Sequence, residues 1–130
     1  MKKVFLGGTC NGSIWRDELI PMLKIDYFNP VVENWTVECQ KEEIKQREIC
    51  DYCLYVITPQ MEGFYSIAEA IDDSNKRPEK ILFCCLDTCN TSDLFTRAQL
   101  RSLYAVKDMI KNNGGKSFYD LVDVADFLNS

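Results

Sequence analysis

The chain of 130 residues contains no histidine, so carboxylates, cysteines, lysines and tyrosines must do any acid–base or nucleophilic chemistry. Ser-His-Asp and Cys-His catalysis, zinc held by histidine and an imidazole base are therefore excluded within one chain. Among the carboxylates, Glu69 is the most informative, because it stands in the small and apolar segment Ser66-Ile67-Ala68-Glu69-Ala70.

Glu69 lies in the first turns of a predicted helix that follows the strongest β-type run of the chain. A carboxylate on a solvated helix face usually has opposite charges three or four positions away, whereas its neighbours here are Tyr65, Ser66 and Asp72-Asp73. Near a helix N-terminus such a carboxylate is expected to stay ionised and can act as a nucleophile. A surface or capping role is the alternative that spacing alone leaves open.

The loop from Gly7 to Ser13 is the second candidate feature. Its glycines let the backbone approach a ligand closely, and N–H groups at the start of the following helix suit a phosphate, a sugar hydroxyl or another polar group. The segment lacks the lysine and the spacing of a P-loop and is not Gly-x-Gly-x-x-Gly. A simple tight turn is an equally weighted alternative.

The cysteines are an odd number, seven, and we expect reduced thiols rather than a disulfide framework. They are Cys10, Cys39, Cys50, Cys53, Cys84, Cys85 and Cys89. A zinc site on Cys50-x-x-Cys53 and Cys84-Cys85-x-x-x-Cys89 is disfavoured, because side chains alternate along a strand and Cys84 and Cys85 would point to opposite faces. Buried thiols that pack as small hydrophobic side chains are the simpler interpretation, and Cys10 is expected to line a pocket without being catalytic.

Apolar runs alternate with helical patterns along the whole chain. Strands are predicted over 2–6, 25–28, 50–58, 80–86 and 116–118. Helices are predicted over 14–23, 38–49, 64–74, 94–111 and 120–128. In the second helix, Ile44 and Ile49 are predicted to be sparse apolar anchors and the other positions to be mostly solvated.

This alternation is typical of a parallel sheet covered on both faces. Right-handed crossovers and the short chain favour a flavodoxin-like, Rossmann-like three-layer α/β sandwich with a five-stranded parallel sheet in the order 2-1-3-4-5. The chain would then reverse direction between the first and third strands. Ligands are expected beyond the carboxyl ends of those strands, where loops 7–13 and 58–66 meet.

Composition indicates one domain over residues 1–130, with 46% hydrophobic and 27% charged residues. The net charge of −5 makes nucleic acid an unexpected partner. No apolar run approaches the length of a membrane span or of a signal segment, so we expect no membrane partner and a cytoplasmic location.

Three segments carry a family resemblance when they are taken together. They are Val4–Arg16 (VFLGGTCNGSIWR), Glu42–Asp51 (EEIKQREICD) and Glu62–Ala70 (EGFYSIAEA), with YFNPVV at 27–32. A strand ends in a glycine loop, a charged helix leads into an Asp-initiated strand, and a small-residue helix carries a glutamate. This arrangement resembles the nucleoside 2-deoxyribosyltransferase family, and most of all its nucleoside 2-deoxyribosyltransferase-like branch, over residues 1 to about 125.

The resemblance implies that Glu69 attacks the anomeric carbon of a 2-deoxyribosyl group and displaces the base. The covalent glycosyl-enzyme would be discharged by another base or by water with net retention. Glu43 matches a second active-site carboxylate that holds the sugar or the nucleophile, and a solvated helix charge is the alternative. Substrate contacts are expected from Gly7, Gly8, Thr9, Cys10, Asn11, Trp15, Asn29, Pro30, Gly63 and Ser66. We expect no metal and no organic cofactor, and the resemblance implies a homo-oligomer.

The chain departs from the family pattern at Gly63, where Asp or Ser is common, at Ile71, which replaces a glycine, and at Phe5, which replaces a tyrosine. Hydrolysis of a nucleoside or nucleotide N-glycosidic bond would tolerate these changes, as would binding without turnover. The rival hypothesis is therefore a non-catalytic module for a nucleotide-derived, ADP-ribose-like ligand, and a pure scaffold is a third. Arg16 and Arg47 are the basic residues that could favour a nucleotide.

Four aromatic residues could stack on a nucleobase, an interaction worth about 1–3 kcal/mol per base. They are Trp15, Trp35, Phe64 and Tyr65. The helical pattern around Trp15 favours a place in the core. For Trp35, a lid and a subunit contact are equally plausible.

Overall fold

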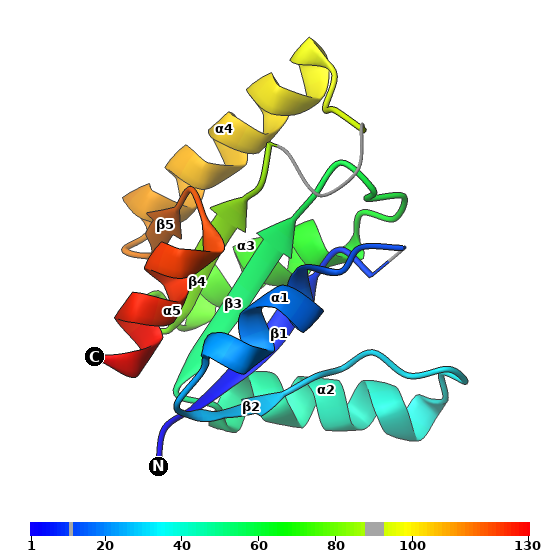
Figure 1. Ribbon diagram of the computed structural model, residues 1–130, viewed down its shortest axis with the longest axis vertical. Coiled ribbons are helices and arrows are strands. Elements are labelled where there is room, and N and C mark those ends of the chain that lie inside the picture. Colours follow the sequence, from blue (N-terminus) through cyan, green and yellow to red (C-terminus); the bar gives the residue numbers. More distant parts are fainter. Residues whose placement is uncertain (11, 88–92) are drawn as a thin grey trace.

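The computed structural model describes residues 1–10, 12–87 and 93–130, and a five-stranded parallel sheet forms its centre (Figure 1). The strands are β1 (Lys3–Gly8), β2 (Asp26–Phe28), β3 (Tyr52–Ile57), β4 (Ile81–Cys85) and β5 (Lys116–Phe118). Their order in the sheet is β2-β1-β3-β4-β5. This confirms the predicted flavodoxin-like order and the three-layer α/β architecture.

Helices cover both faces of the sheet. They are α1 (Trp15–Leu19), which continues into a 3-10 turn (Ile20–Met22), α2 (Val37–Ile49), α3 (Tyr65–Lys76), α4 (Arg97–Asn112) and α5 (Leu121–Asn129). α1 and α5 lie on one face, and α2, α3 and α4 lie on the other (Figure 1). Within the described part of the chain, none of these helices has the length and apolar character needed to cross a membrane.

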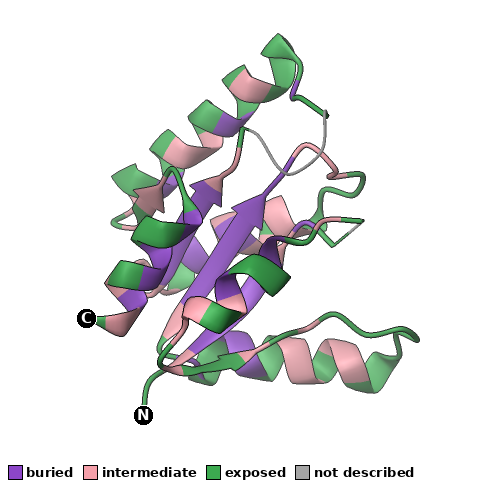
Figure 2. Cartoon of the chain, viewed as in Figure 1, coloured by how far each residue is buried: buried purple, intermediate pink, exposed green. Residues whose placement is uncertain are grey.

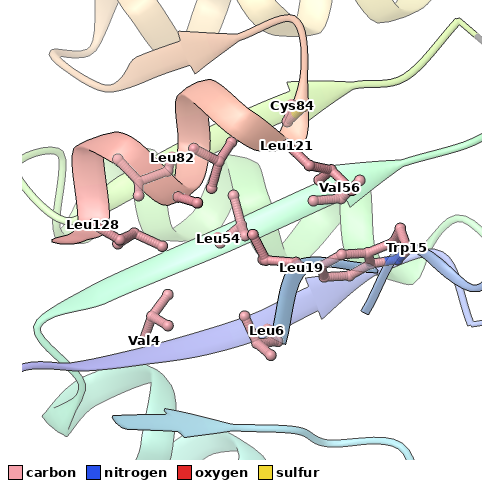
Figure 3. Close-up of a cluster of buried hydrophobic side chains, with 12 residues drawn as sticks. Val4, Leu6, Trp15, Leu19, Leu54, Val56, Leu82, Cys84, Leu121 and Leu128 are labelled. Atoms are coloured by element: carbon pink, nitrogen blue, oxygen red, sulfur yellow. The ribbon is translucent and has the colours of Figure 1, made fainter. Parts of the chain in front are cut away.

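Alternation along the strands divides the core into two layers. Val4, Leu54 and Leu82 pack with α1 and α5 in one cluster, part of which Figure 3 shows. Phe5 and Tyr55 belong to the cluster on the other face. The three central strands β1, β3 and β4 are almost entirely buried between the layers, whereas the edge strands β2 and β5 are partly exposed (Figure 2).

The cysteines of β4 follow the same alternation. Cys84 belongs to the first cluster, while Cys85 packs against the second, which confirms that they point to opposite faces. Cys50 and Cys53 are buried free thiols. Cys89 lies outside the described residues.

Two helices differ from their predictions. In α2, the predicted anchors Ile44 and Ile49 are 45% and 56% exposed, whereas Gln46 and Arg47 are buried. The anchor prediction was wrong, because the inner face of α2 meets acidic side chains of α3 rather than an apolar surface. α4 begins after Thr96, where Thr96 and Gln99 form a reciprocal capping box, so the predicted start at 94 was too early.

The glycines at the end of β1 bring its loop into direct contact with β3. Gly8 has a φ of 120°, and a Cβ there would lie 2.1 Å from the carbonyl oxygen of Val56, so no other residue fits. The Thr9 N–H donates to that same oxygen at 2.9 Å. In return, the hydroxyl oxygen of Thr9 accepts from the N–H of Thr58 at 2.9 Å. The loops that follow β1 and β3 are thus joined where the sheet order reverses.

Candidate active site

A cleft of about 270 Å³ opens at the carboxyl ends of β1 and β3. Its walls come from the loop after β1, the loop after β3, the start of α3, and the side of α2. The lining residues are Gly8, Thr9, Cys10, Trp35, Glu43, Met61, Glu62, Gly63, Tyr65, Ser66 and Glu69. Both predicted ligand loops therefore contribute to one cavity.

Many of the predicted site residues meet in this cleft. Glu43 and Glu69 line it together with Gly8, Thr9, Cys10, Gly63 and Ser66. Other predicted contacts lie elsewhere. Gly7 is inside β1, and Asn29 and Pro30 follow β2 and are absent from the described lining of the cleft. Asn11 lies outside the described residues.

Trp15 lies beneath the glycine loop rather than in the cleft. Its ring is 1% exposed in the core, and the indole N–H donates to the Thr9 carbonyl oxygen at 2.9 Å. The adjacent Arg16 is buried too, and it donates to the Leu6 and Thr9 carbonyl oxygens at 2.9 and 2.8 Å. The two side chains hold the glycine loop through its carbonyl oxygens. Because the guanidinium of Arg16 donates to the backbone, it is not available to bind a ligand.

Glu69 occupies the inner wall of the cleft. Its side chain is 13% exposed, and Oε2 lies 3.6 Å from Nη1 of Arg47. Burial raises the pKa of Glu69 from 4.5 to about 7; Arg47 opposes this rise, and the charges of Glu43, Asp73 and Asp72 add to it. The sequence predicted that the helix N-terminus favours the ionised form of Glu69, and burial works against that effect. Glu69 is the fifth residue of α3, and the helix dipole acts mainly within the first turn.

Arg47 reaches Glu69 from α2, 22 residues earlier in the chain. The same guanidinium donates to Asp72 Oδ2 and to Asp73 Oδ1, both at 2.9 Å. Asp73 is completely buried, and it also accepts hydrogen bonds from the hydroxyl of Tyr55 and from Arg77. A chain of contacts therefore links the centre of the sheet to the carboxylate in the cleft.

The protonation states in this network follow from burial and charge. Burial and the nearby Asp73 raise the pKa of Tyr55 above its usual value, so its hydroxyl keeps its proton and donates. Burial works against the charged form of Arg47, but the hydrogen bond to Asp73 and the negative charges around it raise its pKa overall. Arg47 therefore remains a cation beside Glu69.

Glu43 is the second carboxylate of the cleft. It is half-buried on α2, and burial raises its pKa while Arg47 partly offsets the rise. Because the charge of Glu43 also raises the pKa of Glu69, the two groups are close enough to disfavour double ionisation.

Some residues of this site were not among the predicted contacts. Met61 and Glu62 line the cleft, as do Trp35 and Tyr65, which the sequence suggested only as possible stacking residues. The sequence suggested Arg47 only as a basic residue that could bind a nucleotide. Its carboxylate partners on α3 could be identified only from the packing of α2 against α3. Among the described residues no group of three or more metal-ligating side chains forms, and neither lysine nor arginine lines the cleft.

Comparison with known families adds an independent finding. The family model described as "Nucleoside 2-deoxyribosyltransferase like" matches residues 1–89. The chain belongs to this family. The comparison with curated proteins gave no significant match, and neither did the comparison with solved structures.

The matched region of this nucleoside 2-deoxyribosyltransferase-like protein contains β1 to β4 and every residue that lines the cleft. It is shorter than the resemblance to about residue 125 that the sequence suggested. Family membership points to glycosyl transfer at nucleosides as the general reaction, and to a nucleoside as the small-molecule substrate.

The Arg47→Gln variant tests the contacts that position Glu69. The substitution removes the positive charge that α2 places beside the buried Asp73. Because the loss of one partner of a buried ion pair leaves the other charge without compensation, we expect the free energy of unfolding to fall by about 3 kcal/mol. Urea unfolding measures the loss. Lys45→Gln is the matched control, because it makes the same charge change on the exposed side of α2. Equal stability of the two variants would contradict the role given to Arg47.

The Glu69→Gln variant tests the burial of the carboxyl group. A carboxyl whose pKa is raised on folding stabilises the folded state at low pH, and this stabilisation is lost as the pH rises from 4.5 through about 7. The shift corresponds to about 3 kcal/mol. Because a glutamine side chain does not titrate, we expect the stability of the variant relative to wild type to increase by up to that amount between pH 4.5 and pH 8.

Thermal or urea unfolding across this pH range measures the effect. Glu79→Gln, at an exposed position, should differ from wild type by less than about 0.5 kcal/mol throughout. A constant difference between Glu69→Gln and wild type would show that Glu69 has an ordinary pKa.

Proposed function

We propose that this protein cleaves or transfers at the N-glycosidic bond of a nucleoside, with Glu69 as the nucleophile. The observation that supports this most directly is the position of Glu69, which lines the cleft at the sheet reversal while Arg47 contacts it from behind. A carboxylate with a pKa near 7 is available as a nucleophile at neutral pH, and it is more basic than a solvated glutamate.

The reaction would proceed in two displacements. Glu69 attacks the anomeric carbon, the bond from that carbon to the base nitrogen breaks, and a glycosyl ester forms on Glu69. A second base or a water molecule then attacks the same carbon and releases the carboxylate, so the configuration is retained.

Glu43 is a positioning carboxylate in this scheme. It lies on the α2 side of the cleft, where it can accept hydrogen bonds from sugar hydroxyls. Its charge also raises the pKa of Glu69. The backbone of Gly8 to Cys10 forms the opposite wall, and the rings of Trp35 and Tyr65 offer surfaces for the base.

A nucleoside fits this cleft better than a nucleotide. Arg16 and Arg47, the two candidates for binding a phosphate, are engaged with carbonyl oxygens and with carboxylates respectively. Assembly into a homo-oligomer stays a prediction from the family resemblance, and a cytoplasmic location stays a prediction from the apolar runs of the sequence.

A turnover assay with deoxynucleosides and free bases tests the proposal. Exchanged nucleoside and released sugar are measured by chromatography. We expect Glu69→Gln to lower the rate by at least about 1000-fold because the nucleophile is lost, and Glu43→Gln to lower it by about 10- to 100-fold because the sugar is held less well. The kcat/KM of wild type should rise with pH through about 7, as Glu69 ionises.

Glu38→Gln is the control for Glu43→Gln, because Glu38 is an exposed carboxylate on the same helix. Its rate should equal that of wild type. If wild type and Glu69→Gln turned over equally, Glu69 would not be the nucleophile. If no substrate turned over while a nucleotide-derived ligand raised the melting temperature, the protein would be a binding module.

A further inference from the structure

The cleft has an unusual balance of charge for a site that binds a nucleoside. Glu43, Glu62 and Glu69 line it, and no lysine or arginine does so among the described residues. Arg47 lies behind Glu69 and is shared with Asp72 and Asp73. In the described part of the chain, neither Glu43 nor Glu62 forms a salt bridge. The open side of the cleft is therefore negative, which attracts a cation and repels a phosphate.

Two aromatic side chains face the same space. Trp35 is 56% exposed and Tyr65 is 63% exposed, although both line the cleft. Their accessible ring faces have the negative quadrupole that attracts cations, and nearby carboxylates strengthen that attraction. Stacking on Trp35 and Tyr65 would suit any base. Glu43 and Glu62, which form no salt bridge in the described part of the chain, line the same cleft, and this combination favours a base that carries a positive charge.

The chemistry of bond cleavage leads to the same class of substrate. A neutral base leaves as an anion unless an acid protonates it, and because the chain has no histidine, another side chain of the cleft, such as Glu43 or Tyr65, would have to supply that proton. Glu69 must be ionised in order to attack, so it cannot be that acid at the same moment. A ring that already carries a positive charge needs no acid, because it leaves as a neutral base.

We propose that the preferred substrate of this cleft is a nucleoside whose heterocycle carries a fixed positive charge, such as an N-alkylated purine or a pyridinium ring. This inference rests on the proposed function. Glu62, Trp35 and Tyr65 would bind the charged ring, while Glu69 reacts with the sugar.

The two displacements balance for such a substrate. In the first, an oxygen of Glu69 bonds to the anomeric carbon, and the electron pair of the breaking carbon–nitrogen bond neutralises the ring. A carboxylate and a cation thereby become a neutral ester and a neutral base, a change that a partly desolvated cleft favours. In the second, the oxygen of water bonds to the same carbon, the ester bond returns its electron pair to Glu69, and a proton goes to solvent.

Binding of a matched pair of uncleavable bases tests the inference. The N-methylnicotinamide cation and neutral nicotinamide differ by one methyl group and one charge, and neither has a sugar to lose. Isothermal titration of wild type should give a Kd about tenfold lower for the cation, within the range that cation–π and carboxylate contacts provide. The preference should weaken as salt is added.

Variants locate the source of the preference. Glu62→Gln and Trp35→Leu should each weaken binding of the cation by about threefold or more and leave nicotinamide nearly unchanged. Glu79→Gln is the matched control, since Glu79 is exposed and directly precedes Lys80 and β4, at the opposite end of the sheet. Equal affinity of wild type for the two bases, or no detectable binding of the cation, would overturn the inference. An equal effect of Glu79→Gln and Glu62→Gln would also overturn it.

A parallel turnover assay separates this inference from the proposed function. The substrates are 2′-deoxyguanosine and its cationic N7-methyl derivative, with each rate divided by that of spontaneous hydrolysis. Turnover of 2′-deoxyguanosine that depends on Glu69, with no preference for the cationic base, would leave the proposed function standing and the inference refuted. Tight binding of the cation with turnover of neither nucleoside would refute the proposed function, and the inference with it.

Discussion

The contact between Arg47 of α2 and the acidic face of α3 is the interaction on which the candidate site depends. One guanidinium holds Asp73 in the core, Asp72 at the edge, and Glu69 in the wall of the cleft. Tyr55 extends the same network into the centre of the sheet. Buried ion pairs offset their large desolvation cost only when the geometry is good. The contacts with Arg47 therefore hold α3, and with it the wall of the cleft, in one position.

The glycine loop provides the opposite wall by a different means. Gly8 allows the chain to pass against the Val56 carbonyl, and the buried side chains of Trp15 and Arg16 hold the loop through its carbonyl oxygens. Backbone contacts thus define one side of the cleft and charged side chains define the other. Between them, Glu69 is kept partly desolvated, which raises its pKa and would make the carboxylate more reactive at neutral pH.

The sequence predicted the sheet order and the meeting of the two loops, because strand alternation and crossover handedness depend on local patterns and general rules. It also pointed to Glu69 and Glu43 as candidates. It could not show the partner of Glu69, because Arg47 is far away in the chain and lies on a helix whose isoleucines face solvent. The sequence could not show the raised pKa of Glu69 either, because the burial that raises it arises only when the helices and loops pack together. The helical pattern had already favoured the core position of Trp15, whereas the place of Trp35 in the lining of the cleft could be seen only in the folded structure.

Identification of the sugar-bearing residue during turnover is the most direct test of the account. Wild-type protein is quenched in acid while it acts on a deoxynucleoside, then digested, and its peptides are weighed by mass spectrometry. The account predicts one deoxyribosyl group on the peptide that contains Glu69, with fragmentation placing it on that residue. Turnover accompanied by a sugar on another residue, or by products of inverted configuration with no adduct, would contradict it.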